Sequence, residues 1–161
     1  MLKKYFVRKL TEKDVNLVLS LQQQHPTYYK YCPPEPSIEG VLQQMKALPP
    51  KKEIKDKYFI GFFEKDKLVA IMDMIVEYPN KETIFIGLFM VNKEYAGQGI
   101  GKEIIEYCVL KFKQKGFSFV RLGYMKNNLQ SEAFWRKCQF ENVGIETNNN
   151  QGTVVVLERK L

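Results

Sequence analysis

The chain has 161 residues and a net charge of +7, with 45% hydrophobic and 27% charged residues. This composition excludes a disordered, collagen-like or coiled-coil chain and predicts one globular domain over residues 1–161. No apolar run approaches the roughly 20 residues that span a bilayer, and the N-terminus lacks the apolar core of a secretory signal. Three cysteines without metal-ligand spacing predict neither a disulfide framework nor a metal site. We therefore expect a cytoplasmic protein with no metal and no membrane partner.

The positive charge lies mainly in the first third of the chain. Residues 1–57 hold 11 Lys and Arg against 6 Asp and Glu, but no run of five basic residues occurs. Such diffuse charge favours solubility over nucleic-acid binding, so we expect no nucleic-acid partner.

The first third of the chain predicts a strand and two helices. Residues 4–9 favour a strand, and Thr11 with Asp14 forms a capping box for a helix that ends near His25. A tyrosine-rich connector follows. Ser37 is then a candidate N-cap for a second helix, which the prolines at 49 and 50 stop.

The rest of the chain alternates strands with two further helices. Three runs rich in β-branched and aromatic residues predict an antiparallel meander of three strands. From Ile100 onward the apolar residues recur at helical spacing, which predicts a helix with one apolar face that ends at Gly116. The order βααβββαβαββ indicates the α+β class. The expected elements are strands Tyr58–Glu64, Leu68–Tyr78, Thr83–Val91 and Phe117–Met125, a helix over about 130–138, and a hairpin of Phe140–Glu146 with Thr153–Arg159.

Glycines cluster where the strand ending at Val91 gives way to the helix beginning at Ile100. They are Gly97, Gly99 and Gly101. The first N–H groups of a helix have no partner within it, and glycines let a pyrophosphate approach them while the helix dipole adds attraction. Lys102 adds one ionic contact. This segment is a candidate anion site, although the glycines could also serve only a tight turn.

Two other phosphate-binding motifs compete for this segment. A Walker loop is excluded, because Ala96 stands at its first glycine and Glu103 at its magnesium-binding hydroxyl. A dinucleotide fingerprint has different glycine spacing and an acidic residue on the next strand, where this chain has Arg121. Because an arginine can meet a 2′-phosphate, an NADP site remains an alternative.

The segment from Ala96 to Gly101 resembles the acetyl-CoA loop of the GNAT superfamily of N-acetyltransferases, with Ala96 in place of the usual Arg or Gln. The run from Asn128 to Phe140 resembles the second signature of the family. There Phe134 and Trp135 stand at the usual apolar–Tyr pair, and Gln139 precedes Phe140 where a glycine is usual. The resemblance covers nearly the whole chain and implies a three-layer fold with a mixed, mostly antiparallel sheet flanked by helices.

The resemblance implies that acetyl-CoA is the co-substrate and that the pantetheine arm follows the end of the strand Thr83–Val91. A strand edge that splays from its neighbour offers unpaired amides, and one N–H can polarise the thioester carbonyl. The residues expected to bind the cofactor on this basis are Phe89, Met90, Val91, Gly97, Gln98, Gly99, Ile100, Gly101, Lys102, Asn128, Phe134 and Trp135.

The catalytic groups depart from the family pattern. The usual carboxylate position holds Phe85, and the usual tyrosine acid is Trp135, whose indole cannot usefully protonate a thiolate. Asp73, an acid within an apolar strand, and Tyr124, near the end of the splayed strand, are the remaining candidates for base and acid.

The implied reaction is direct acetyl transfer to a primary amine of a small molecule or protein. The tyrosines of the connector, Tyr28, Tyr29 and Tyr31, are candidates for acceptor contacts, and the basic flank disfavours polycationic acceptors. An acyl-CoA-binding sensor or interaction module without catalysis is the alternative function. The sequence leaves open the acceptor, a longer acyl donor and a homodimer.

Overall fold

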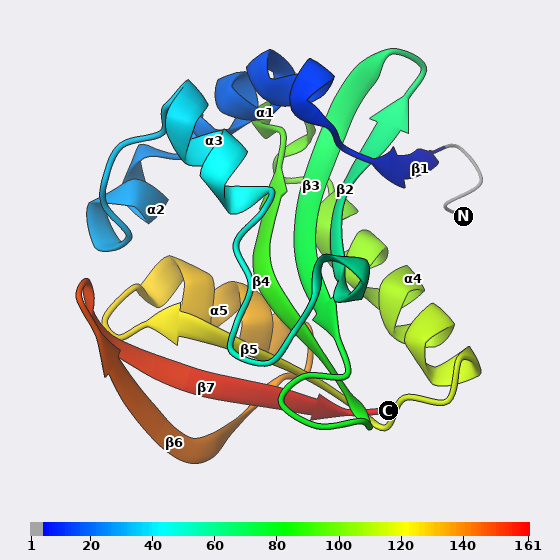
Figure 1. The fold of residues 1–161 in the computed structure, drawn as a ribbon, viewed down its shortest axis with the longest axis vertical. Coiled ribbons are helices and arrows are strands. Elements are labelled where there is room, and N and C mark those ends of the chain that lie inside the picture. The colour runs from blue at the N-terminus through cyan, green and yellow to red at the C-terminus, as the bar shows by residue number, and fades with distance from the viewer. Residues whose placement is uncertain (1–4) are drawn as a thin grey trace.

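The protein is described by a computed structural model over residues 5–161, so Lys4, the first residue of the predicted strand 4–9, lies outside the described residues. Within them seven strands form one sheet in the order β1-β2-β3-β4-β5-β7-β6 (Figure 1). All neighbours are antiparallel except β4 and β5. This confirms the α+β class and the mostly antiparallel sheet. The strands are β1 Phe6–Lys9, β2 Lys57–Glu64, β3 Lys67–Val76, β4 Thr83–Val91, β5 Phe119–Met125, β6 Glu141–Asn149 and β7 Gly152–Lys160.

Helices cover both faces of the sheet (Figure 1). One core contains the apolar side of α4 and Trp135 of α5, and the other contains side chains of α1 and α3. Strand β3 serves both cores by alternation, with Met72 in the first and Ile71 in the second. We call these sides the α4–α5 face and the α1–α3 face. The helices are α1 Val15–Gln22, α2 Pro26–Tyr31, α3 Ile38–Gln44, α4 Ile100–Gln114 and α5 Leu129–Lys137.

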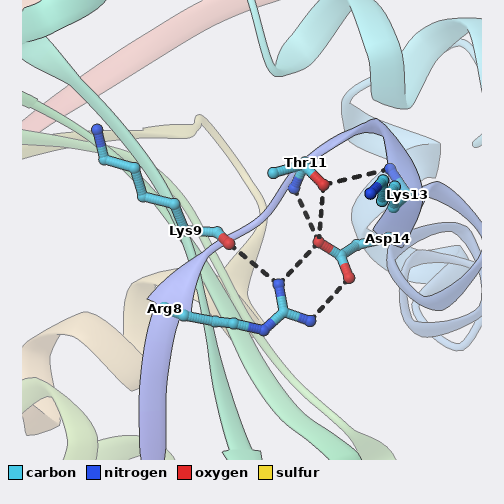
Figure 2. A network of polar contacts seen from close by, with 5 residues as sticks. All are labelled: Arg8, Lys9, Thr11, Lys13 and Asp14. Carbon is cyan, nitrogen blue, oxygen red and sulfur yellow. Dashed lines mark hydrogen bonds and ion pairs between the residues drawn. The ribbon is translucent and has the colours of Figure 1, made fainter.

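The predicted capping box is present between β1 and α1, where it caps a 3-10 turn, Glu12–Asp14, that leads into α1 (Figure 2). The Thr11 side chain accepts from Lys13 N, and Thr11 N donates to Asp14 Oδ2 at 2.8 Å. The Arg8 guanidinium donates to both oxygens of Asp14, at 2.9 and 2.8 Å. This bidentate bond lowers the pKa of the Asp14 carboxyl and ties the edge strand to the start of α1.

The predicted connector is partly wrong, because its tyrosines lie on a short helix. Pro26 occupies the first turn of α2, where its missing N–H costs nothing and its φ suits a helix. Helix α1 ends at Gln22, and His25 becomes the N-cap of α2. The described residues therefore form one α-helix more than the predicted order.

The remaining boundaries differ by a few residues. Strand β3 ends at Val76 and β5 begins at Phe119, whereas the final hairpin is longer than predicted. Strands β6 and β7 pair as far as Asn149 and Gly152, so their turn is tight. The Ser37 N-cap and the helix starting at Ile100 are confirmed.

Candidate active site

Strands β4 and β5 separate halfway along their length. They pair only from Thr83 to Ile86 on β4, whereas β4 stays paired with β3 as far as Val91. A bulge accompanies the separation, because Asp73 opposes Leu88 while Met74 opposes Ile86, which leaves Gly87 as the extra residue. Beyond Gly87 the β4 backbone groups that point toward β5 are not bonded to it. This opening is the splayed edge that the resemblance leads us to expect.

The α4 N-terminus presents free donors next to the splayed edge. Gly97 and Gly99 have φ values of 75° and 74°, and a Cβ at either position would meet nothing within 4 Å. Although residues 96–99 form a turn, no hydrogen bond of good geometry joins the backbone N–H groups of residues 97–102 to an acceptor among the described residues. Such a row of N–H groups at the positive end of a 15-residue helix suits a pyrophosphate. The Lys102 side chain is exposed in the first turn of the helix.

The third glycine has a packing role. A Cβ on Gly101 would lie 3.0 Å from Cε1 of the Phe134 ring and 3.4 Å from Val91 Cγ2. Its absence lets the start of α4 approach both α5 and the end of β4. Gly101 is therefore a close packing contact, and the donor row depends on Gly97 and Gly99.

An aromatic cluster lies on the α4–α5 face of the splayed strand. Phe89 stacks on Phe134 with 5.9 Å between ring centroids, and Trp135 contacts both rings. Trp135 also meets Phe140 edge-on at 5.2 Å and is 8% exposed. The indole at the usual tyrosine position is therefore part of the core.

The other predicted cofactor residues divide by the direction of their side chains. Met90 and Ile100 are buried in the two cores, so only their backbone groups can serve a ligand. Asn128 is buried, and its Oδ1 accepts from Ser131 N at 3.2 Å as the N-cap of α5. Gln98 is exposed in the loop, and its Nε2 lies 3.5 Å from Glu94 O.

His25 joins the end of α1 to the end of β4. Its Nε2 lies 2.9 Å from Val91 O, and because a carbonyl only accepts, Nε2 carries the hydrogen. Burial lowers the pKa of the imidazole. The neighbouring Gln24 accepts from Lys93 N at 2.9 Å. Sequence reasoning treated His25 as a helix-end residue and missed this contact.

Asp73 lies on the α1–α3 face, beside the bulge. A Cβ on Gly87 would come within 3.3 Å of Asp73 Oδ2, and Gly87 itself is exposed. Lys57 Nζ lies 3.1 Å from each carboxylate oxygen and has hydrogen-bond geometry only to Oδ2. Burial raises the pKa of the Asp73 carboxyl, and Lys57 opposes that shift without cancelling it. A carboxylate with a raised pKa next to an exposed glycine can act as a base.

The structure does not bring Tyr124 to Asp73. Tyr124 packs against the core on the α4–α5 face, half-buried, and its pKa is raised by burial and then by Glu132. It lies on β5 beyond Leu122, the last residue paired with β4. The two candidates therefore lie on opposite faces of the sheet, at the same splayed region.

The tyrosines of α2 divide between packing and a cavity. Tyr28 and Tyr29 meet edge-on at 4.9 Å, and both pack against the core of the α1–α3 face. Tyr31 lines a cavity of about 330 Å³ between α2 and the tip of the β6–β7 hairpin, together with Lys30 and Lys126. A larger groove of about 950 Å³ runs between α1 and the 64–68 turn and reaches Asn92, the residue after β4.

Residues 5–161 hold no group of three or more His, Cys, Asp or Glu side chains placed to bind a metal. Within the same range, no helix combines the length and apolarity needed to cross a bilayer.

Solved structures share the fold over nearly the whole chain. An acetyltransferase from Thermus thermophilus is 18% identical with a TM-score of 0.79, and the match covers 99% of each chain. The PaiA N-acetyltransferase from Thermoplasma acidophilum, solved in complex with coenzyme A, is 19% identical with a TM-score of 0.67, covering 98% of this chain and 99% of that one. The ribosomal-protein-S18-alanine N-acetyltransferase from Escherichia coli is 13% identical with a TM-score of 0.68, covering 97% and 93%.

The chain matches a protein family but no individual curated protein. The Acetyltransferase (GNAT) family matches residues 21–140, a range that holds the splayed strand, the glycine loop and the aromatic cluster. The chain belongs to the GNAT acetyltransferase family.

Proposed function

We propose that the protein is an acetyl-CoA-dependent N-acetyltransferase that moves the acetyl group directly to a primary amine. The observation that carries this proposal is the row of N–H groups at residues 97–102, which lies at the α4 N-terminus next to the splayed edge of β4. Because Gly97 and Gly99 carry no Cβ, the loop leaves room for a pyrophosphate next to these N–H groups. We further propose that residues 1–161 act as one domain in the cytoplasm, since all three cysteines are free thiols.

Acetyl-CoA supplies the acetyl group as an activated thioester. In the proposed site the N–H groups of 97–102 and Lys102 hold the pyrophosphate, and the backbone of Phe89–Val91 holds the pantetheine amides. Phe134 forms the apolar wall of the opening beside β4, with Trp135 packed behind it, and Asn128 fixes the start of α5. One free N–H of the splayed strand polarises the thioester carbonyl.

Asp73 is the proposed general base. An alkyl ammonium has a pKa of ~10.4 and must lose a proton before its nitrogen can attack. Asp73 Oδ2, the atom beside Gly87, receives that proton directly or through one water. The amine nitrogen then forms its bond to the acetyl carbon as the carbon–sulfur bond breaks. Tyr124 is the proposed donor of the proton that the departing thiolate takes up. The second proton, which the nitrogen loses as the amide forms, returns through water to the Tyr124 phenolate, and Asp73 releases its proton to solvent.

The buried Trp135 favours a second candidate function. Because no tyrosine stands at that position, the chain could be an acyl-CoA-binding sensor that does not transfer the acetyl group. Binding without turnover separates this function from the enzyme.

Thermal unfolding with saturating acetyl-CoA, CoA and NADPH tests the donor site. A ligand at 100 times its Kd adds about 2.7 kcal/mol and raises the midpoint by several degrees for a chain of this length. We expect a shift with acetyl-CoA and CoA. A shift with NADPH alone would replace the proposal with an NADP site.

Release of CoA thiol tests the transfer itself. The assay uses a panel of primary amines that includes amino-acid amides, dipeptides with a free N-terminus and polyamines. We expect thiol release with at least one member, and the basic N-terminal region predicts weak turnover of polyamines. Tight binding of acetyl-CoA with no release across the panel would favour the sensor.

A further inference from the structure

Lys57 is a buried lysine on the α1–α3 face. It is the first residue of β2, and its side chain is 3% exposed. Lysine is rarely this buried unless its ammonium is paired. Here Nζ donates to Ala47 O at 2.7 Å and to Asp73 Oδ2 at 3.1 Å. The ammonium therefore links three segments: the turn after α3, strand β2 and the carboxylate on β3.

The geometry of this link sets the direction of the carboxylate. Lys57 sits within 3.1 Å of both oxygens of Asp73, whose side chain is 13% exposed. The backbone contact to Ala47 holds the ammonium from the other side, so it cannot follow the carboxylate toward solvent. On its far side Asp73 faces Gly87, which is exposed and where an added Cβ would lie 3.3 Å from Oδ2.

We propose that Lys57 is a positioning residue, which holds the Asp73 carboxylate against the Gly87 bulge in the orientation that accepts a proton from the acceptor amine. This inference rests on the proposed acetyltransferase function. Lys57 does not touch the acceptor, and it acts through Asp73 alone.

The other groups that face Asp73 carry no charge near neutral pH. Tyr28 of α2 interacts with Asp73, and burial raises the pKa of its phenol well above the ordinary value. Cys32, which contacts Tyr28, has a thiol pKa that burial also raises. From β4 the neighbour is Gly87, which does not titrate. Lys57 on β2 therefore supplies the charge that opposes the desolvation of Asp73.

A purely structural ion pair would, on removal of Lys57, lower stability and raise the pKa of Asp73 without moving the acidic limb of the kcat profile. A positioning role makes a different prediction. Without the ammonium, the desolvated carboxylate loses its counter-charge, so its pKa rises and the active, ionised form appears only at higher pH. The titration of Asp73 and the acidic limb of the kcat profile should then move together.

The experiment compares the wild type with Lys57→Met by two readouts. The first is the pH titration of the Asp73 carboxyl carbon by NMR on protein labelled with carbon-13 aspartate, assigned with Asp73→Asn. We expect the Asp73 midpoint to rise by about one pH unit or more. The second is kcat against pH with the best amine of the panel, where the acidic limb should rise by the same amount while the Kd of acetyl-CoA stays within twofold.

Lys52→Met is the matched control. Lys52 also pairs with an aspartate, Asp56 at 3.5 Å, with both side chains largely buried, and Lys52 also donates to a backbone carbonyl. Its removal should leave the Asp73 midpoint and the acidic limb unchanged. If Lys57→Met does not fold, Lys57→Gln, which keeps an N–H donor and loses the charge, carries the same expectation.

The positioning role of Lys57 and the proposed acetyltransferase activity can fail independently. An Asp73 midpoint that does not move in the Lys57 variant, or an acidic limb that stays in place while the midpoint moves, would overturn the positioning role. A wild type that turns over no amine would count against the proposed enzyme, while the NMR titration would still decide whether Lys57 controls the carboxylate.

Discussion

The two halves of the proposed site are built from different parts of the chain. The donor half, residues 97–102, consists of backbone N–H groups at the start of α4 and comes from one short stretch of sequence. The acceptor half consists of side chains from separate strands, with Asp73 on β3 and Lys57 on β2, beside Gly87 of β4. They meet at one place, the splayed end of β4.

The two halves should therefore differ in their sensitivity to substitution. A backbone site tolerates a missing side chain, as Ala96 in place of the usual Arg or Gln illustrates, because the glycine conformations and the helix dipole remain. The acceptor half depends on one carboxylate whose orientation comes from a single ammonium. Substitutions on one half should therefore leave the other half intact.

The largest effect should come from the acceptor half. Replacing Asp73 by Asn removes the proposed base, so kcat should fall by about 10²- to 10⁴-fold. The Kd of acetyl-CoA, measured by titration calorimetry, should stay within twofold. Asp66→Asn, at an exposed turn, is the control for loss of one carboxylate. A kcat within twofold of wild type in Asp73→Asn would remove Asp73 from the mechanism.

A methyl group at Gly99 should weaken binding of acetyl-CoA to the donor half. Gly99→Ala and Gly116→Ala both place a Cβ at a positive φ, 74° and 96°, with nothing within 4 Å, at opposite ends of α4. Each should cost about 1–2 kcal/mol of unfolding free energy. The Kd of acetyl-CoA should rise tenfold or more only in Gly99→Ala, where the methyl group points into the proposed pyrophosphate site. Equal binding by the two variants would contradict a ligand at this loop.

The substitution Gly87→Ala tests the splayed end of β4, where the two halves of the site meet. The new methyl group would lie 3.3 Å from Asp73 Oδ2, between the carboxylate and the exposed surface. We expect the KM of the amine to rise by a few-fold to tenfold with little change in acetyl-CoA binding. Steady-state kinetics at saturating acetyl-CoA measures this. An unchanged KM would mean that the amine does not pass Gly87.

The smallest effect concerns the contact between His25 and Val91. The folded state lowers the pKa of His25, mainly by burial, so the unfolded chain binds more protons below the ordinary value of about 6.5. Stability should therefore fall as the pH drops below that value and recover above it. Urea unfolding from pH 5 to 8 should show this dependence in the wild type and a weaker one in His25→Gln. Parallel profiles for the two proteins would exclude His25 as the source.

The elements and the donor loop could be predicted because their signals are local. Apolar periodicity and capping residues placed α4 and the meander, and the spacing of Gly97 and Gly99 marked a turn into a helix. The helix α2 was missed, because a tyrosine-rich run before several prolines resembles a connector. There the proline at the first helical position was the signal, since it fits the start of a helix.

The acceptor half could be predicted only in part, because it depends on strand register. Asp73 stood out as an acid in an apolar strand, but nothing local shows that Lys57, sixteen residues earlier, lies opposite its carboxylate. Gly87 offered one signal, since a glycine inside a strand often marks a bulge. Tyr124 was placed on the correct strand, yet its side chain lies on the face opposite Asp73.

The central claim is that acetyl-CoA binds the free N–H groups at the start of α4. Titration of nitrogen-15-labelled protein with acetyl-CoA, followed by two-dimensional NMR, tests this most directly. We predict that the amide signals of residues 97–102 shift most, together with those of Phe89–Val91, while the signals of Leu17 and Ser20 on α1 and of Asp66 in the 64–68 turn stay in place. Binding that leaves the amides of residues 97–102 unmoved would contradict the account.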